Sequence, residues 1–214
     1  MGKGNYGFMR KFLSYLIASV VLTTAAAISA LAGEQKAVFA GGCFWGVEAV
    51  FEHVKGVIAV RSGYAGGTKD AANYEDVSGG STKHAEAVEI RFDPGKVAYE
   101  QLLNIFFVVA HDPTQVDRQG PDTGTQYRSV IFYSDDRQKR SAAAFIKALN
   151  DSKAFDKPIA TEITPLTGFF EAEEHHQNYL KRNPDDPYIV YNDLPKLKEL
   201  KNKFPALYRA VPGP

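Results

Sequence analysis

The sequence predicts an α+β fold, a two-layer sandwich with a ferredoxin-like split βαβ core, extra loops and a C-terminal extension. Short apolar runs of strand length alternate with segments whose apolar residues recur at helical spacing. Their order is strand, helix, strand, strand, helix, strand, which is typical of two helices packed on one face of an antiparallel-rich sheet. The 214 residues contain no internal repeat and no long linker, so we expect one domain over residues 33–214.

The first strand, helix and strand are predicted from residues 36 to 63. Residues 36–40 form a short apolar run, and a helix over 43–53 is indicated by apolar residues at helical spacing, namely Phe44, Val47, Val50, Phe51 and Val54. Gly56 ends this helix, and a strand follows over 57–63. Residues 66–82 are rich in Gly, Asn, Asp and Ser, so we expect a surface loop there.

The second half of the core repeats this pattern. Residues 84–92 alternate as a strand does, with one face made of His84, Glu86, Val88, Ile90 and Phe92. A helix over 102–110 is indicated by Leu102, Leu103, Phe106, Phe107 and Ala110. A polar loop over 111–126 leads to a strand over 127–133.

The remaining residues predict additions to the core. A helix over 135–149 has Ser134 as a plausible N-cap. We then expect a strand over 159–163, a short helix over 173–180 and a last helical piece over 194–204.

The first 32 residues have the composition of a secretory signal peptide. Lys3, Arg10 and Lys11 are the only charges before Glu34, and an apolar run then reaches a small-x-small pattern that ends at Ala32. We expect cleavage after Ala32 and export to the periplasm. The alternative is an uncleaved membrane anchor, although the apolar run is short for a span. The 25 basic and 25 acidic residues cancel, so nothing predicts a nucleic-acid partner.

Cys43 is the only cysteine, and Trp45, the only tryptophan, lies two residues away. A thiol at the first turn of a helix faces unpaired backbone N–H groups and the positive end of the helix dipole, which favour the thiolate. An unpaired cysteine in an exported chain indicates a reactive thiol or an intermolecular bond. The alternative is an inert cysteine packed as a small hydrophobe.

Glu86 is the second informative residue, because it shares a strand face with apolar side chains. Desolvation would raise the pKa of its carboxyl and make it a proton donor, whereas the strand pattern alone slightly favours an exposed glutamate at a strand end. Tyrosines gather in loops beside these strands, namely Tyr64, Tyr74 and Tyr127. Asp122 lies in a Gly- and Pro-rich run and by itself indicates a turn.

The segment Gly42-Cys43-Phe44-Trp45-Gly46-Val47-Glu48 resembles the defining motif of the A-type peptide-methionine (S)-sulfoxide reductases. Further motifs of that family follow in its order and spacing: Gly63-Tyr64-Ala65-Gly66-Gly67, His84-Ala85-Glu86-Ala87-Val88, His111-Asp112-Pro113-Thr114, Gly124-Thr125-Gln126-Tyr127-Arg128-Ser129 and His176-Gln177-Asn178-Tyr179-Leu180. The resemblance covers about residues 38–183.

This resemblance implies a role for each of seven residues: Cys43 as nucleophile, Glu86 as acid, Tyr74 and Tyr127 as oxygen-binding phenols, Phe44 and Trp45 as the pocket for the S-methyl group, and Asp122 as an acidic residue near the sulfoxide. It thereby overrides the preference that the strand pattern alone gives for an exposed Glu86. The Cys43 thiolate is then expected to attack the sulfoxide sulfur, release methionine and end as a sulfenic acid.

The chain departs from many relatives in having no cysteine to resolve that sulfenic acid. Residues 181–188 contain none, and Ser78 stands where some relatives carry another cysteine. We therefore expect an external reductant, either a thioredoxin-like protein or a small thiol, and no cofactor or metal. Expected substrates are oxidised proteins, peptides or free methionine sulfoxide, and the expected oligomeric state is a monomer.

Three other functions are consistent with parts of the sequence. A cysteine hydrolase would pair Cys43 with a histidine and need no reductant, although the spacing singles out no base among His84, His111, His175 and His176. A metal module could use Glu171, Glu174, His175 and His176, but a solvated acidic helix face fits this segment better. A silent protein that binds oxidised methionine would not depend on Cys43 for any reaction.

Overall fold

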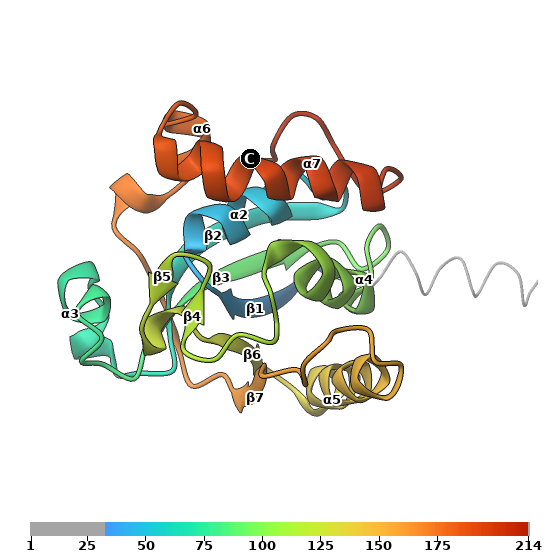
Figure 1. Cartoon of the computed structure of the whole chain (residues 1–214), viewed down its shortest axis with the longest axis horizontal. Helices are drawn as coiled ribbons and strands as arrows, with labels where there is room; N and C mark the ends of the chain where they lie inside the picture. The colour runs from blue at the N-terminus through green and yellow to red at the C-terminus, as the bar shows by residue number, and fades with distance from the viewer. Residues whose placement is uncertain (1–32, 214) are drawn as a thin grey trace, which may run out of the picture. The chain divides into compact units, whose positions relative to one another are not determined.

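The computed structural model describes residues 33–213, and the predicted signal peptide lies outside them. The helices, helical turns and strands are, in chain order, β1 Gln35–Gly41, α2 Phe44–Glu52, β2 Val57–Ala65, η1 Lys69–Ala71, α3 Tyr74–Ser78, β3 Ala85–Phe92, α4 Tyr99–Ile105, η2 Phe106–Ala110, β4 Arg118–Gln119, β5 Asp122–Thr123, η3 Thr125–Tyr127, β6 Ser129–Tyr133, α5 Asp136–Asp151, β7 Glu162–Pro165, β8 Phe169–Glu171, η4 Glu174–His176, α6 Tyr179–Arg182, η5 Ile189–Asp193 and α7 Leu194–Lys203 (Figure 1). Among residues 33–213, no helix combines the length and apolar character needed to cross a membrane.

The main sheet has six strands in the order β7-β6-β1-β3-β2-β8. Within its four central strands, β6-β1-β3-β2, each adjacent pair is antiparallel. Helix α2 connects β1 to β2, and α4 lies in the connection from β3 to β6. This arrangement is a split βαβ unit, so the predicted fold class is confirmed. At the edges, β7 adds parallel to β6 and β8 adds antiparallel to β2.

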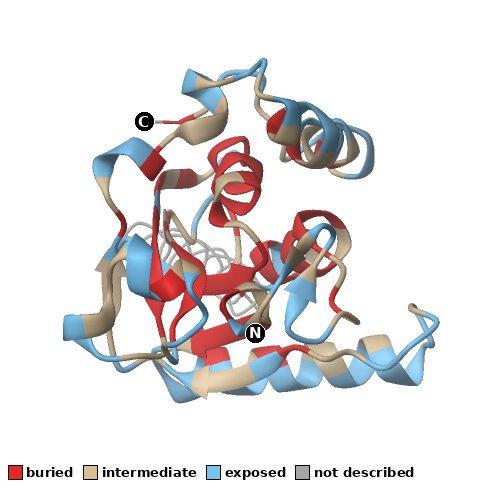
Figure 2. Ribbon diagram, turned by 60° about the vertical axis from the view of Figure 1, so that its left-hand side comes forward, coloured by how far each residue is buried: buried red, intermediate tan, exposed pale blue. Residues whose placement is uncertain are grey.

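The helices form the second layer of the sandwich. A core cluster joins one face of the sheet, including Phe39 and Ile90, to α2 through Phe51 and to α4 through Leu102. The opposite face carries smaller side chains such as Ala87, which the segment after β7 covers. Buried residues are accordingly concentrated in the strands and in α2 (Figure 2). The alternation predicted for β3 therefore separates two apolar clusters.

The C-terminal extension is fastened to the helix that begins beside Cys43. Helix α7 packs against α2 (Figure 1). Beyond α7, Tyr208 forms an isolated bridge with Val54, and the N–H of Gly213 donates to the carbonyl of Glu52. The C-terminal extension therefore packs against α2 and is hydrogen-bonded to the residues at its C-terminal end.

Several predicted boundaries need correction. Asp135, and not Ser134, caps α5, because its carboxylate accepts from the N–H of Gln138 at 2.8 Å. The predicted surface loop over 66–82 contains helix α3, which Val77 anchors in the core. Tyr127 lies in the turn η3, before the strand in which it was expected. The strand expected at 159–163 is β7, which begins later, at Glu162.

The helix expected over 173–180 is divided into η4 and α6. The interruption falls at Gln177 and at Asn178, whose φ of 53° is left-handed. Its cause is tertiary, since the Gln177 side chain bonds both backbone groups of Ser62 in β2. Bonds from a neighbouring strand here outweigh the local preference to continue a helix.

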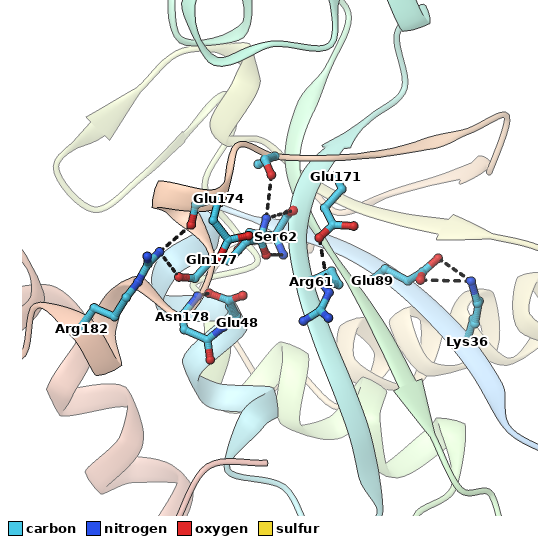
Figure 3. Close-up of polar contacts among 11 residues, drawn as sticks. Lys36, Glu48, Arg61, Ser62, Glu89, Glu171, Glu174, Gln177, Asn178 and Arg182 are labelled. Carbon is cyan, nitrogen blue, oxygen red and sulfur yellow. Dashed lines mark hydrogen bonds and ion pairs between the residues drawn. The ribbon is translucent and has the colours of Figure 1, made fainter. Parts of the chain in front are cut away.

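Glu48 of α2 makes a second contact with the residues at this interruption. Its carboxylate is buried, and Oε2 accepts from the N–H of Asn178 at 2.9 Å, while Oε1 has no partner among the described residues (Figure 3). Burial, with the charge of Glu52, raises the pKa of Glu48 to about 8. The contact joins α2 to the segment that carries His176 and Tyr179.

Replacing Glu48 with glutamine should flatten the pH dependence of stability. Between pH 4.5 and about 8 the folded protein keeps a proton on Glu48 that the unfolded chain releases, so the free energy of unfolding falls as pH rises and levels off above about 8. One such proton contributes at most about 1.4 kcal/mol per pH unit. Urea denaturation between pH 5 and 9 should show that the free energy of unfolding falls less with rising pH in Glu48→Gln than in wild type.

The matched control is Glu89→Gln, whose carboxylate is bonded to Lys36 at the surface. It should keep the wild-type pH dependence. A Glu48→Gln protein with the wild-type slope would contradict a buried, protonated Glu48.

Candidate active site

Cys43 lies in the turn between β1 and α2, where it is the N-cap of the helix. Gly42 makes the turn possible, since its φ of 92° favours glycine and an added Cβ would lie 2.5 Å from Cγ of Gln119. The sulfur therefore sits at the first turn of α2, as predicted.

The pKa of the Cys43 thiol, however, is raised well above its ordinary value. Burial is the largest cause, followed by the charges of Glu86 and Asp193, while a backbone bond from Trp45 lowers it. The N-terminus of α2 thus acts in the expected direction but is outweighed. The helix N-terminus favours the thiolate, as the sequence predicts, but burial and the neighbouring carboxylates favour the neutral thiol more strongly.

Glu86 lies in β3 with its carboxyl buried, at 2 % exposure. Its Oε2 accepts from the N–H of Phe44, the first residue of α2, at 3.0 Å. Burial raises the pKa of Glu86 to about 8, and the Asp122 charge adds to the effect. An exposed strand-end glutamate is thus excluded, and Glu86 carries a proton at neutral pH.

Tyr74 and Tyr127 reach the same centre from different loops. Tyr74 begins α3 and is 38 % exposed, and Tyr127 ends η3. Besides burial, the charges of Glu86 and Cys43 raise the pKa of both phenols, which places the four groups within electrostatic range. Both hydroxyls are therefore protonated donors at neutral pH.

Tyr64, the third tyrosine that the sequence places beside these strands, has a different role. Its hydroxyl donates to Glu173 at 2.8 Å. The same carboxylate accepts from the backbone N–H of Tyr74 at 2.9 Å. Tyr64 therefore supports the position of Tyr74 through Glu173.

Phe44 and Trp45 form two layers of one aromatic cluster. Phe44 is buried, with its ring 5.2 Å from that of His176. Trp45 is half-buried and stacks on Tyr179 at 3.6 Å, while Tyr188 meets it edge-on at 5.8 Å. Both rings therefore pack beside His176, Phe44 in the interior and Trp45 nearer the surface.

Sequence reasoning did not assign His176, Tyr179 or Tyr188 to the sulfoxide site, although each contacts Trp45 or Asp122. It also did not single out Asp193, which lies beside Gly46 in the first turn of α2. His176 Nδ1 accepts from Trp45 Nε1 at 3.2 Å. The hydroxyl of Tyr188 donates to Asp122, which fixes that carboxylate. His176 and Tyr179 lie in a motif that the sequence showed, whereas nothing local signals Tyr188 or Asp193.

The hydrogen bonds of the histidines in the described part of the chain go to groups other than Cys43. His84 is bonded to loop backbone at Gly67 and Thr68. His111 is bonded to Ser129 Oγ at 2.7 Å, and burial lowers its pKa to about 4. Within residues 33–213, none of the hydrogen bonds joins a histidine to Cys43, and no group of three His, Cys, Asp or Glu side chains could hold a metal ion.

Comparison with known proteins gives concordant results. The model of the family described as peptide methionine sulfoxide reductase matches residues 35–207. A peptide methionine sulfoxide reductase MsrA 2 of Mesorhizobium japonicum is 56% identical over 180 residues, covering 84% of this chain and 92% of that protein. The MsrA 2 of Synechocystis is 55% identical over 172 residues, 80% of each chain.

Two solved structures share the fold. Reduced Mxr1 from Saccharomyces cerevisiae superposes with a TM-score of 0.66 at 33% identity, covering 72% of this chain and 88% of that one. Methionine sulfoxide reductase A of Corynebacterium diphtheriae gives 0.62 at 35% identity, covering 71% and 76%.

Replacing Glu86 with glutamine should lower the pKa of Cys43. Glu86 titrates at about 8, below the thiol, so it is charged when Cys43 loses its proton and opposes that loss. The pH profile of Cys43 alkylation by iodoacetamide should move down by about one unit. Glu89→Gln, on the other face of the same strand, should not move it, and an unmoved profile in Glu86→Gln would contradict the electrostatic coupling.

Proposed function

The chain belongs to the peptide methionine sulfoxide reductase family and reduces methionine sulfoxide, and from this premise we propose that Cys43 is its nucleophile and Glu86 its acid. The observation that carries the proposal is the bond from the N–H of Phe44 to Glu86 Oε2. It places a protonated carboxyl beside the turn that holds the only cysteine.

The first step follows from these protonation states. Glu86, with the hydroxyls of Tyr74 and Tyr127, donates to the sulfoxide oxygen and makes the sulfur electrophilic. As Cys43 attacks that sulfur, its thiol proton and the proton of Glu86 pass to the sulfoxide oxygen, the S–O bond breaks and water leaves. Water then attacks the Cys43 sulfur, the new S–S bond breaks, methionine is released and a proton returns to Glu86. In sum, a thiol and a sulfoxide become a sulfenic acid and a thioether, so Cys43 is oxidised and methionine is formed.

The aromatic cluster supports a site for the S-methyl group. Trp45 is held by its stack on Tyr179 and its bond to His176, which presents it as a rigid wall. Methyl groups bound to sulfur pack well on such rings. The buried ring of Phe44 is the second proposed contact of the methyl group, and Asp122, which accepts from Tyr188, is the proposed acidic residue near the sulfoxide.

An external thiol then restores Cys43, because the chain has no second cysteine. A thioredoxin-like protein or a small thiol would supply the two electrons. The S epimer of methionine sulfoxide, free or in oxidised proteins, is the proposed substrate. The signal-like N-terminus favours export and protein repair in the periplasm.

Without reductant, the enzyme should convert about one methionine sulfoxide per chain and stop. Cys43 then remains a sulfenic acid, since no internal thiol can resolve it. Mass spectrometry with a sulfenic-acid trap should find one adduct on Cys43 after turnover on methionine-S-sulfoxide. The Cys43→Ser variant should form neither adduct nor methionine. Continued turnover without any thiol would contradict the mechanism.

Replacing Glu86 with glutamine should slow the first turnover by about 100-fold or more, because the general acid is lost. The wild-type rate should also fall above about pH 8, where Glu86 loses its proton. Single-turnover kinetics between pH 6 and 10 should show that fall in the wild type and in Glu89→Gln. If Glu86→Gln showed the same fall, another group would have to be the acid.

A further inference from the structure

Asp193 and Lys196 form an ion pair beside Cys43 that the mechanism above does not use. Asp193 ends η5, its side chain has no exposed surface, and Oδ1 lies 3.0 Å from Lys196 Nζ. Such a carboxylate is normally found fully bonded. Its Oδ2, however, has no hydrogen-bond partner among the described residues.

The pair occupies space that Gly46 leaves open in the first turn of α2. A Cβ on Gly46 would lie 2.0 Å from Oδ1 of Asp193 and 2.8 Å from Nζ of Lys196. Since Cys43 caps the same turn, the carboxyl lies on the side of that turn that faces the C-terminal extension. The charge of Asp193 accordingly raises the pKa of the thiol.

Reduction of a sulfenic acid needs an acid of its own. When a thiolate attacks the sulfur of Cys43–S–OH, the S–O bond breaks and the departing hydroxyl must take up a proton to leave as water. Glu86 lies on the sheet side of this turn, where it accepts from the N–H of Phe44. Asp193 approaches the same turn from the opposite layer.

We propose that Asp193 is the proton donor for reduction of the Cys43 sulfenic acid by an external thiol, with Lys196 positioning its carboxyl. The inference rests on the proposed function. The attacking thiolate and Cys43 form a mixed disulfide, and Asp193 gives its proton to the hydroxyl that leaves as water. A second thiol then attacks the mixed disulfide, which releases Cys43 as a thiol and the reductant as a disulfide.

The electrostatic surroundings of Asp193 are consistent with a proton donor. Burial is the main cause that raises its pKa above the ordinary range, and the charges of Asp122 and Asp186 act in the same direction. Lys196 lowers that pKa. Cys43 and Tyr188 are the further titratable groups whose pKa the charge of Asp193 raises.

The test separates the two steps in Asp193→Asn. Cys43 is converted to its sulfenic acid by methionine sulfoxide in one arm and by one equivalent of hydrogen peroxide in the other. Excess 2-mercaptoethanol is then added, and loss of the sulfenic acid is followed by quenching with a trap and mass spectrometry. Without the proton donor, this loss should be about 100-fold slower or more than in wild type.

The first step should be spared. Glu86 and the phenols of Tyr74 and Tyr127 remain in Asp193→Asn, so methionine should form at close to the wild-type rate at neutral pH. A purely structural role would slow both steps together. Glu199→Gln, on the exposed side of α7, is the matched control and should alter neither step.

A pH profile tests the same inference without that variant. In Lys196→Met the pKa of Asp193 rises. The pH above which reduction of the sulfenic acid by 2-mercaptoethanol slows, the alkaline limit, should therefore move to a higher value. An unchanged thiol step in Asp193→Asn, or a limit that moves in Glu86→Gln but not in Lys196→Met, would overturn the inference. Absence of sulfenic acid in the sulfoxide arm alone would instead contradict the proposed function.

Discussion

The bond from the N–H of Phe44 to the carboxyl of Glu86 is the interaction on which the site depends. It joins the first residue of α2 to β3, a central strand of the sheet. The helix that Cys43 caps therefore cannot shift without breaking this hydrogen bond. It also uses one oxygen of a carboxyl that burial keeps protonated, leaving the other free to donate. A single contact thus fixes both the turn that holds Cys43, the proposed nucleophile, and the position of Glu86, the proposed acid.

Burial at this bond has an electrostatic consequence for the thiol. The same low-dielectric environment that raises the pKa of Glu86 also raises that of Cys43. A neutral acid and a neutral thiol can therefore coexist in the resting site, whereas two charges close together would be unfavourable. The substrate then finds its proton donors already protonated and its nucleophile already placed.

The C-terminal extension supplies side chains around Trp45 and Cys43 that the split βαβ core does not provide. It delivers Tyr179 and Tyr188 to Trp45 and Asp193 to the turn of Cys43, from a segment without cysteine. Its attachment depends on buried polar contacts of α2, above all that of Glu48 with Asn178. In this chain the tail is part of the wall of the site, which agrees with a reductant that comes from outside.

The sequence by itself determined the split βαβ core and the family, because strand and helix periods and a contiguous motif around Cys43 are local properties. The same motif predicts Cys43 as the nucleophile. Only the tertiary structure decided the state of Glu86, the break at Asn178 and the direction of the Cys43 pKa. Each of these depends on desolvation or on a partner far along the chain. Strand alternation alone could not show whether Glu86 lies at a solvent-exposed or a buried part of its strand. The position of Cys43 at a helix N-terminus alone could not show that nearby carboxylates raise its pKa.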